Sequence, residues 1–246
     1  MSETVKNYKL IIEYDGTNYA GWQIQPNAPT VQQFISDAIK ILTKEDINLI
    51  GSGRTDSGVH SLGQTANFKT KKEINISKFI YSLNSILPKD IAVKKMENED
   101  IDFNARINAK RRIYLYLFTR YKSPFFDKYS YFYHDKIDCA KLNNLSRFLT
   151  GQKDFTSFCK TISDTDNKIC NVYYIRWKES KGIIFFFIEA DRYLYGMVRA
   201  IIGSLLHASK KNLNENYIEE VLSAKDRTAA GEAVPAKGLF LYKVKY

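Results

Sequence analysis

The chain has 246 residues, of which 44% are hydrophobic and 26% are charged. These proportions are typical of a globular protein, and they exclude a disordered chain, a collagen-like chain and a coiled coil as the main architecture. Lys and Arg number 37 against 27 Asp and Glu, so the net charge is +10, and there are 17 Tyr, 15 Phe and 2 Trp. This composition favours a polyanionic partner such as nucleic acid, although ordinary basic proteins also carry such a charge excess.

The cysteines, histidines and apolar runs indicate which cellular compartment to expect and whether to expect a metal site. The odd number of cysteines argues against a disulfide framework and favours a reducing compartment. Segment 1–9 is polar, and the longest apolar runs, 183–188 and 200–206, are far shorter than a membrane span. We therefore expect a cytoplasmic protein with no signal peptide, no membrane partner and no metal. The residues that lack zinc-site spacing are Cys139, Cys159, Cys170, His60, His134 and His207.

Hydrophobic periodicity in the first hundred residues predicts the order β-α-β-β-α-β. Thr30 is expected to cap the first helix, with Gln33 three positions on as its capping-box partner. Ser77 is expected to cap the second helix. The predicted strands are 8–14, 47–50, 64–70 and 91–96, and the predicted helices are 31–43 and 77–86.

The second half follows the same pattern loosely, with Asp138 expected to cap its first helix. Strands and helices are mixed and several strands form hairpins, so we predict an α+β fold with mainly antiparallel sheet rather than a doubly wound one. We expect two similar domains, 1–104 and 105–246, with a cleft between them. The predicted strands are 112–121, 129–133, 170–178, 183–191 and 239–245, and the predicted helices are 138–149, 194–208 and 215–223.

The segment GRTDSGVH, residues 53–60, is the most informative in the chain. Its two glycines permit turn conformations and the close approach of a ligand. A loop of this kind can present the Asp56 carboxylate beside the Arg54 guanidinium, which would help to keep Asp56 ionised or would bind a phosphate. On the residues alone, a Gly-rich turn with a capping Asp is an alternative to a catalytic loop.

This loop resembles the signature loop of the TruA family of tRNA pseudouridine synthases. Other segments resemble further parts of that family and occur in the family's order. Each segment is short, but together with the loop they are spread over nearly the whole chain, so the combination is specific. The segments are EYDG (13–16), GWQ (21–23), FNAR (103–106), RIYLY (112–116), DFTSF (154–158), MVR (197–199), IG (202–203), DRT (226–228) and PAKGLFL (235–241).

The resemblance implies that Asp56 is the catalytic nucleophile in the isomerisation of uridine to pseudouridine. The reaction cleaves the N1–C1′ bond, turns the uracil and rejoins it through C5. A carboxylate suits this chemistry, because it can add at C1′, stabilise positive charge there or remove a proton from the sugar. The resemblance also implies that Tyr114 lies against the uracil, that Arg199 pairs with the catalytic aspartate and that Arg54 lies beside the extruded nucleotide. On the residues alone, Tyr114 is better explained as an inward-facing strand residue.

The resemblance further implies a pseudouridine synthase fold whose two domains flank an RNA-binding catalytic cleft. The usual substrate in the family is the anticodon stem-loop of tRNA, at uridines 38, 39 and 40, and the usual assembly is a homodimer. Neither a redox change nor net hydrolysis occurs, so no cofactor is expected. Lys110, Arg111 and Arg112 adjoin the motif that contains Tyr114 and are expected to bind RNA, although such clusters are usually solvated surface.

Three alternatives accompany this interpretation. A related enzyme could modify ribosomal RNA by the same chemistry, and nothing in the sequence excludes this. A silent RNA-binding protein is disfavoured by the intact Asp56, Tyr114 and Arg199, and a glycoside or nucleoside hydrolase lacks a second carboxylate in the motif. The sequence also departs from the family pattern, for example at Gly196, where histidine is usual. These departures affect substrate detail more than the reaction.

Overall fold

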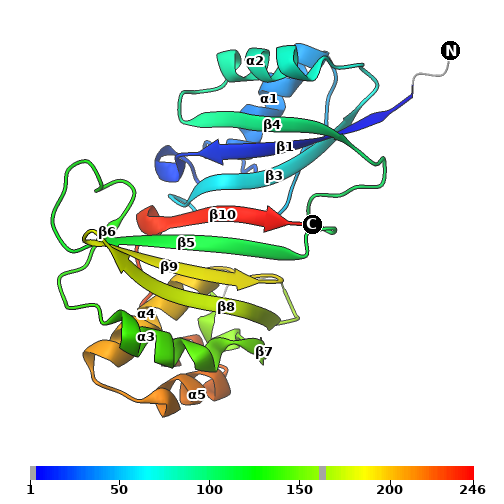
Figure 1. The fold of residues 1–246 in the computed structure, drawn as a ribbon. Coiled ribbons are helices and arrows are strands. Elements are labelled where there is room, and N and C mark those ends of the chain that lie inside the picture. The colour runs from blue at the N-terminus through cyan, green and yellow to red at the C-terminus, as the bar shows by residue number, and fades with distance from the viewer. Residues whose placement is uncertain (1–3, 161–164) are drawn as a thin grey trace. The chain divides into compact units, whose positions relative to one another are not determined.

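The computed structural model describes residues 4–160 and 165–246, so residues 1–3 of the N-terminal segment discussed above lie outside the description. The chain forms two compact units, which are described separately (Figure 1). Unit 1 comprises Met1–Lys110 and Leu241–Tyr246, and unit 2 comprises Arg111–Phe240.

The sheet of unit 1 has the strand order β4-β1-β3-β10, and the short strand β2 also pairs with β3. Strand β1 pairs antiparallel with both β3 and β4, and β2 is antiparallel to β3. Side chains alternate along β1, so that Tyr8, Leu10, Ile12 and Tyr14 are all buried. The strands are β1 (Lys6–Tyr14), β2 (Ile50–Gly51), β3 (His60–Thr70), β4 (Ile91–Glu99) and β10 (Leu239–Lys245).

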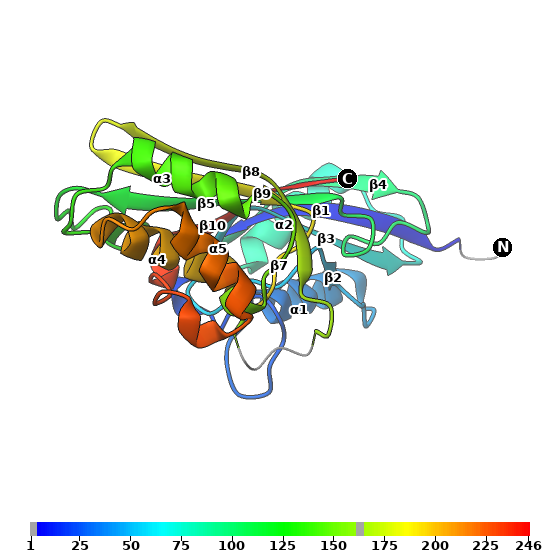
Figure 2. The ribbon, with the colours of Figure 1, turned by 90° about the horizontal axis from the view of Figure 1, so that it is seen from below.

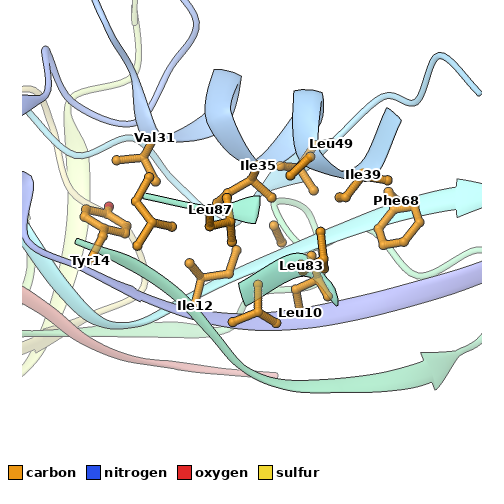
Figure 3. Packing of buried hydrophobic residues seen from close by; sticks show 14 of the residues in the cluster. Leu10, Ile12, Tyr14, Val31, Ile35, Ile39, Leu49, Phe68, Leu83 and Leu87 are labelled. Carbon is orange, nitrogen blue, oxygen red and sulfur yellow. The ribbon is translucent and has the colours of Figure 1, made fainter. Parts of the chain in front are cut away.

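Two helices, α1 (Val31–Thr43) and α2 (Ile76–Ile86), cover the buried side of this sheet. Figure 3 shows Ile35 and Ile39 of α1 and Leu83 of α2 directed toward the apolar side chains of β1. All three are inaccessible to solvent. Their removal from water stabilises this unit together with the rest of the apolar cluster, at about 25 cal/mol per Å² of apolar surface.

The structure confirms the predicted order of elements in unit 1 and corrects three details. The predicted strand 47–50 is only the two-residue β2, Ile50–Gly51. Thr30 lies at the N-cap of α1 but makes no capping bond, and its buried hydroxyl has no partner among the described residues. Asn75, not Ser77, caps α2, because its Oδ1 accepts the backbone N–H of Lys78 at 3.1 Å. Neighbouring Ser, Thr and Asn residues compete for the N-cap, and the sequence alone does not rank them.

Unit 2 contains the strand order β5-β9-β8-β7, with neighbours antiparallel, and β6 runs parallel to β5. The long hairpin of β8 and β9 confirms the predicted pair at 170–178 and 183–191, and β7 was not predicted. The strands are β5 (Arg111–Thr119), β6 (Tyr131–Phe132), β7 (Gly151–Asp154), β8 (Ile169–Ser180) and β9 (Ile183–Ala190).

The helices of unit 2 are α3 (Cys139–Ser146), α4 (Met197–Lys210) and α5 (Glu215–Ala224). Figure 2 shows α4 and α5 on one side of β5, β9 and β8. As predicted, Asp138 caps α3, because its carboxylate accepts the backbone N–H groups of Ala140 and Lys141. The Asn143 side chain exchanges two hydrogen bonds, both 2.9 Å long, with the backbone of Trp177 in β8. These bonds join α3 to β8 where β8 extends beyond β7.

The α+β class with a mainly antiparallel sheet is confirmed. The compact units divide after Lys110, six residues later than the expected domain boundary, and the last six residues group with unit 1. Side-chain amides account for the later division. The buried Asn7 and Asn67 both donate to the carbonyl oxygen of Phe103, and the backbone N–H of Ala105 donates to Asn67.

Candidate functional site

The loop predicted to be catalytic joins β2 to β3 in unit 1. Burial varies along it: Thr55 and Val59 are buried, Asp56 is half-buried, and Arg54 and Ser57 are exposed. The buried residues fix the loop, so the residues between them are held at the surface. This arrangement presents the Asp56 carboxylate on a rigid support.

Hydrogen bonds from β1 and β3 hold the start of this loop. The Ser52 hydroxyl donates to Oε1 of Gln64 at 2.7 Å, and Nε2 of Gln64 donates to the Gly53 carbonyl at 2.9 Å. The hydroxyls of Tyr14 and Thr55 are 2.8 Å apart, and burial raises the pKa of Tyr14, so that its phenol stays neutral. These buried polar groups satisfy one another, which is the condition for a rigid polar cluster.

Two glycines of the opening motifs allow the loop to pack closely. A Cβ atom on Gly16 would lie 2.0 Å from the Val59 carbonyl oxygen, and one on Gly21 would lie 2.4 Å from the Thr55 carbonyl oxygen. Gly21 also has a φ of +101°, which L residues rarely adopt. The segments at 13–16 and 21–23 carry part of the resemblance. The candidate loop packs directly against their glycines.

His60 is an internal anchor of this region. It is 1% exposed, and its Nδ1 accepts the backbone N–H of Gly16 at 3.0 Å. The same Nδ1 lies 3.1 Å from Oδ1 of Asp15. These contacts let the buried His60 ring hold the turn after β1.

Arg54, predicted to lie beside the extruded nucleotide, is exposed. Within the part of the chain that the structure describes, no salt bridge joins its guanidinium to a carboxylate, so the expected support of Asp56 by Arg54 is not observed. The exposed guanidinium faces solvent, where a phosphate could reach it.

Tyr114 lies in β5 of unit 2, where it is 8% exposed and pairs in register with Ile188 of β9. Its ring meets Tyr193 edge-on at 5.0 Å between centroids, with an interplanar angle of 88°. The Tyr193 hydroxyl lies within hydrogen-bond distance of the Arg112 and Ile188 carbonyls, at 3.2 and 3.0 Å. Burial raises the pKa of Tyr193, so this residue is a neutral donor that buttresses Tyr114.

Tyr116 shares a face of β5 with Tyr114, as the period of two predicts, but it is fully buried. Its hydroxyl donates to the Pro235 carbonyl at 2.7 Å, and burial raises its pKa. Two neighbouring tyrosines on one strand face thus differ in accessibility. Tyr116 is a packing residue of the core.

Arg199 lies in the first turn of α4, half-buried. Its Nε donates to the Val234 carbonyl at 2.6 Å, and the Val234 N–H donates to the Arg199 carbonyl at 3.3 Å. In unit 2, the segment around Val234 thus supplies a backbone partner for this side chain, and the pairing of Arg199 with Asp56 stays a prediction. The bond at Nε fixes the plane of the guanidinium.

That segment packs unusually closely on α4. A Cβ atom on Gly203 would lie 1.7 Å from the Glu232 carbonyl oxygen, and one on Gly231 would lie 2.9 Å from the backbone of Ser204. The Ser204 hydroxyl also accepts the Gly231 N–H at 2.8 Å. Since only glycine fits at this crossing, the close approach of Glu232 explains the glycine of the IG motif at 202–203.

The predicted RNA-binding cluster is divided between the units. Lys110, in unit 1, is exposed, and its backbone N–H donates to the Lys245 carbonyl at 2.9 Å. Arg111 pairs with Glu189 at 3.1 Å and stacks over the Tyr173 ring at 4.2 Å. Arg112 donates to the Asp191 carbonyl at 2.7 Å. The glutamate partially offsets the charge of Arg111, so this part of the cluster is less cationic than its sequence suggests.

The sequence prediction therefore falls on both units. Arg54, Asp56 and Lys110 belong to unit 1, and Arg111, Arg112, Tyr114 and Arg199 belong to unit 2. Sequence reasoning missed the supporting residues Asn67, Tyr193 and Val234. They lie far along the chain from the residues that they support, so no local motif indicates them.

Two further features concern metals and membranes. Within residues 4–160 and 165–246, no cluster of three or more His, Cys, Asp or Glu is arranged to hold a metal ion. None of the helices in that part of the chain has the length and apolar character that crossing a membrane requires.

Comparison with known proteins covers nearly the whole chain. Residues 10–107 and 146–246 match the tRNA pseudouridine synthase family. The chain is 42% identical to tRNA pseudouridine synthase A of Caldicellulosiruptor saccharolyticus over 244 residues, which are 98% of this chain and 100% of the relative. It is 41% identical to the protein of the same name from Clostridium acetobutylicum, with the same coverage.

Solved structures give a more distant likeness. A chain in a Cbf5–Nop10–Gar1 complex has a TM-score of 0.37 and 13% identity, with 80% of this chain and 53% of that chain covered. This chain thus spans about half the length of that one. The two full-length sequence relatives and the family match agree with the motifs described above. The chain belongs to the tRNA pseudouridine synthase family, whose members are isomerases.

Proposed function

We propose that the protein isomerises uridine to pseudouridine at positions 38, 39 and/or 40 in the anticodon stem-loop of tRNA, with Asp56 as the catalytic nucleophile. The observation that carries the proposal is the presentation of Asp56. Its carboxylate is half-buried between the buried Thr55 and Val59, on a loop that packs against Gly16 and Gly21. A carboxylate held in this way suits attack at C1′, because little reorganisation is needed.

Each of the other site residues has a role in this proposal. Arg199 orients the Asp56 carboxylate, and its fixed Nε supports that role because the guanidinium plane is set before substrate binds. The Tyr114 ring packs on the uracil and its hydroxyl takes part in proton transfer. The edge-on contact with Tyr193 supports this by limiting ring rotation. Arg54 occupies the space vacated by the extruded nucleotide, and its exposed guanidinium is consistent with that.

The chemistry balances without a cofactor. The N1–C1′ bond breaks, a C5–C1′ bond forms, and the proton from C5 is lost as N1 gains one. The proposed macromolecular partner is tRNA, contacted by Lys110, Arg111 and Arg112, and the net charge of +10 supports binding to its phosphates. A homodimer, a cytoplasmic location and two domains that flank an RNA-binding cleft are part of the same proposal.

Tritium release from 5-tritiated uridine in an anticodon stem-loop tests the proposal. Unmutated protein is expected to release tritium at position 38, 39 or 40, and Asp56→Asn is expected to release none while binding tRNA within about tenfold, which is about 1.4 kcal/mol. Asp37→Asn is the matched control, because this exposed carboxylate on α1 is hydrogen-bonded to Gln33 and lies outside the candidate loop. Near-normal release by Asp56→Asn would overturn the role of Asp56. Tritium release only from ribosomal RNA would overturn the proposal that tRNA is the substrate.

A further inference from the structure

Unit 2 contains a cationic pocket that the proposed reaction does not use. Its volume is about 670 Å³. Four cationic side chains line it: Lys160, Lys168, Lys225 and Arg227. They come from the segment before β8 and from the turn that follows α5, so they are close in space but spread along the chain.

Within the part of the chain that the structure describes, three of the four cations form no ion pair with a carboxylate. Among the described residues, Lys225 is the one member of the four with a carboxylate partner, since its Nζ lies 3.1 Å from Oδ2 of Asp154. Arg227 donates Nη1 to the carbonyls of Ala230 and Gly231 at 3.2 and 3.3 Å. Carbonyl acceptors fix the direction of the guanidinium but leave its positive charge in place.

The two remaining lysines are also held by uncharged groups. Nζ of Lys160 lies 4.2 Å from the centroid of the Tyr195 ring, a cation–π contact. Nζ of Lys168 lies 3.9 Å from Sγ of the buried Cys159. Both contacts order a flexible side chain, so part of the entropy that a ligand would have to remove is already lost.

One carboxylate, Asp226, also lines the pocket, but it is engaged in its own turn. It accepts the backbone N–H of Thr228 at 2.8 Å and the Thr228 hydroxyl at 2.7 Å. These hydrogen bonds lower the pKa of Asp226, so it is charged at neutral pH. Against Asp154 and Asp226, the four cations leave an excess of two positive charges in one concave surface.

We propose that this pocket binds backbone phosphates of the RNA substrate through residues other than the candidate catalytic ones. The inference rests on the proposed function, because that function supplies a polyanion. Ordered cations in a concave site attract an anion of two or more charges. The volume falls within the range of about 300–1,000 Å³ that ligand sites occupy, so it admits more than one phosphate group.

The test is the double variant Lys160→Gln/Lys168→Gln in the full-length protein. Its affinity for tRNA is expected to fall about tenfold at low salt. The slope of log affinity against log salt is expected to become shallower by about 1–2, because fewer phosphates are neutralised and fewer counterions are released. The rate at saturating tRNA should stay within about twofold, since neither lysine belongs to the proposed catalytic group.

The matched control is Lys136→Gln/Lys178→Gln. These two lysines are exposed residues of unit 2 that do not line the pocket, so the control removes the same charge elsewhere. It should change tRNA affinity by less than about twofold and leave the slope unchanged. An equal loss of tRNA affinity in the control would show that only the net charge matters, and it would overturn the proposal. An unchanged salt slope in the pocket variant would overturn it as well.

A separate measurement with inorganic pyrophosphate distinguishes the source of the anion. If the pocket variant loses pyrophosphate binding and keeps full tRNA affinity, the site takes a free anion and the RNA proposal fails. The binding assays do not require turnover. A protein that makes no pseudouridine but shows the expected slope change would therefore refute the proposed function and still support the pocket.

Discussion

The two units support their candidate catalytic residues in different ways. In unit 1, Asp56 lies on an irregular loop whose path is set by contacts with glycine backbones and by buried side-chain hydrogen bonds. In unit 2, Tyr114 lies on a strand and Arg199 on a helix, so regular hydrogen bonding already fixes their backbone. A group on a loop needs dedicated supports for precise placement, whereas one on a strand or helix needs fewer.

This difference predicts where small changes act. Disrupting the close packing beneath the loop should damage activity more than stability, because the loop carries little of the apolar core. Disrupting the close packing beneath α4 should damage stability first, because ten residues of that helix are buried. The predictions below are ordered by the size of the expected effect.

Gly203→Ala should have the largest effect on stability. The added Cβ would lie 1.7 Å from the Glu232 carbonyl oxygen, so the backbone of α4 or of the facing segment must move. We expect a loss of about 3 kcal/mol, at the upper end of overpacking effects. Urea denaturation measures it. Gly151→Ala is the control, because no atom lies within 4 Å of its Cβ and only its φ of +87° opposes the change, at about 1 kcal/mol. Equal losses in the two variants would remove the close packing from the explanation.

Among these variants, Gly21→Ala should show the largest loss of activity relative to its loss of stability. The Cβ would meet the Thr55 carbonyl oxygen at 2.4 Å and displace the residue next to Asp56. A shift of about 1 Å at a reacting group costs on the order of 100-fold in rate. Single-turnover tritium release measures this loss, with tRNA affinity measured alongside. If the rate falls no more than the folded fraction does, the loop tolerates displacement and the contrast between the units fails.

The tyrosines of β5 separate chemistry from packing on one strand. Tyr114→Phe should leave folding and binding intact and slow the chemical step by about tenfold, below the range of about 10²–10⁴ that a full general acid–base group contributes. Tyr116→Phe should leave the Pro235 carbonyl without its donor and cost about 1.5 kcal/mol of stability with little effect on the rate. Single-turnover kinetics and urea denaturation on both variants test the pair. If Tyr114→Phe lowered only the stability and Tyr116→Phe lowered only the rate, Tyr116 would be the residue that takes part in the chemistry and Tyr114 the packing residue.

How much of this was accessible from the sequence depends on how far apart the cooperating residues lie. The Asp56 loop is one contiguous motif, and α1 was predicted at 31–43, as observed, because apolar residues recur at helical spacing. The pocket brings Lys160 near Arg227, about seventy residues on, and no periodicity indicates such a meeting. Strand β7 was missed because its four residues, GQKD, are polar and carry no alternation of apolar side chains.

The backbone contact that supports Arg199 is another feature that the sequence does not indicate. The resemblance implies that Arg199 pairs with Asp56, which stays a prediction, whereas the Nε partner that the structure shows in unit 2 is a backbone carbonyl, which any residue can supply. Carbonyls leave no trace in the sequence. What the sequence does record is the glycine pair, Gly203 and Gly231, that lets the carbonyl come close enough.

The smallest predicted effect is a pH dependence at the edge of the cationic pocket. Hydrogen bonds from Thr156, together with Lys225, lower the pKa of Asp154 in the folded protein. A carboxyl whose folded pKa is lowered stabilises the fold above its unfolded pKa of about 3.9, and this contribution is lost as the pH falls through the folded value. Asp154→Asn should therefore lose about 0.5 kcal/mol near neutral pH, as expected for a partly exposed ion pair, and should lose less stability than the unmutated protein on acidification. Urea midpoints between about pH 3 and pH 7 measure this, with Asp37→Asn as the control on unit 1. If the two variants show the same pH profile, the ion pair with Lys225 does not hold the pocket edge in place, and the ordering of its cations must come from the uncharged contacts of Lys160, Lys168 and Arg227.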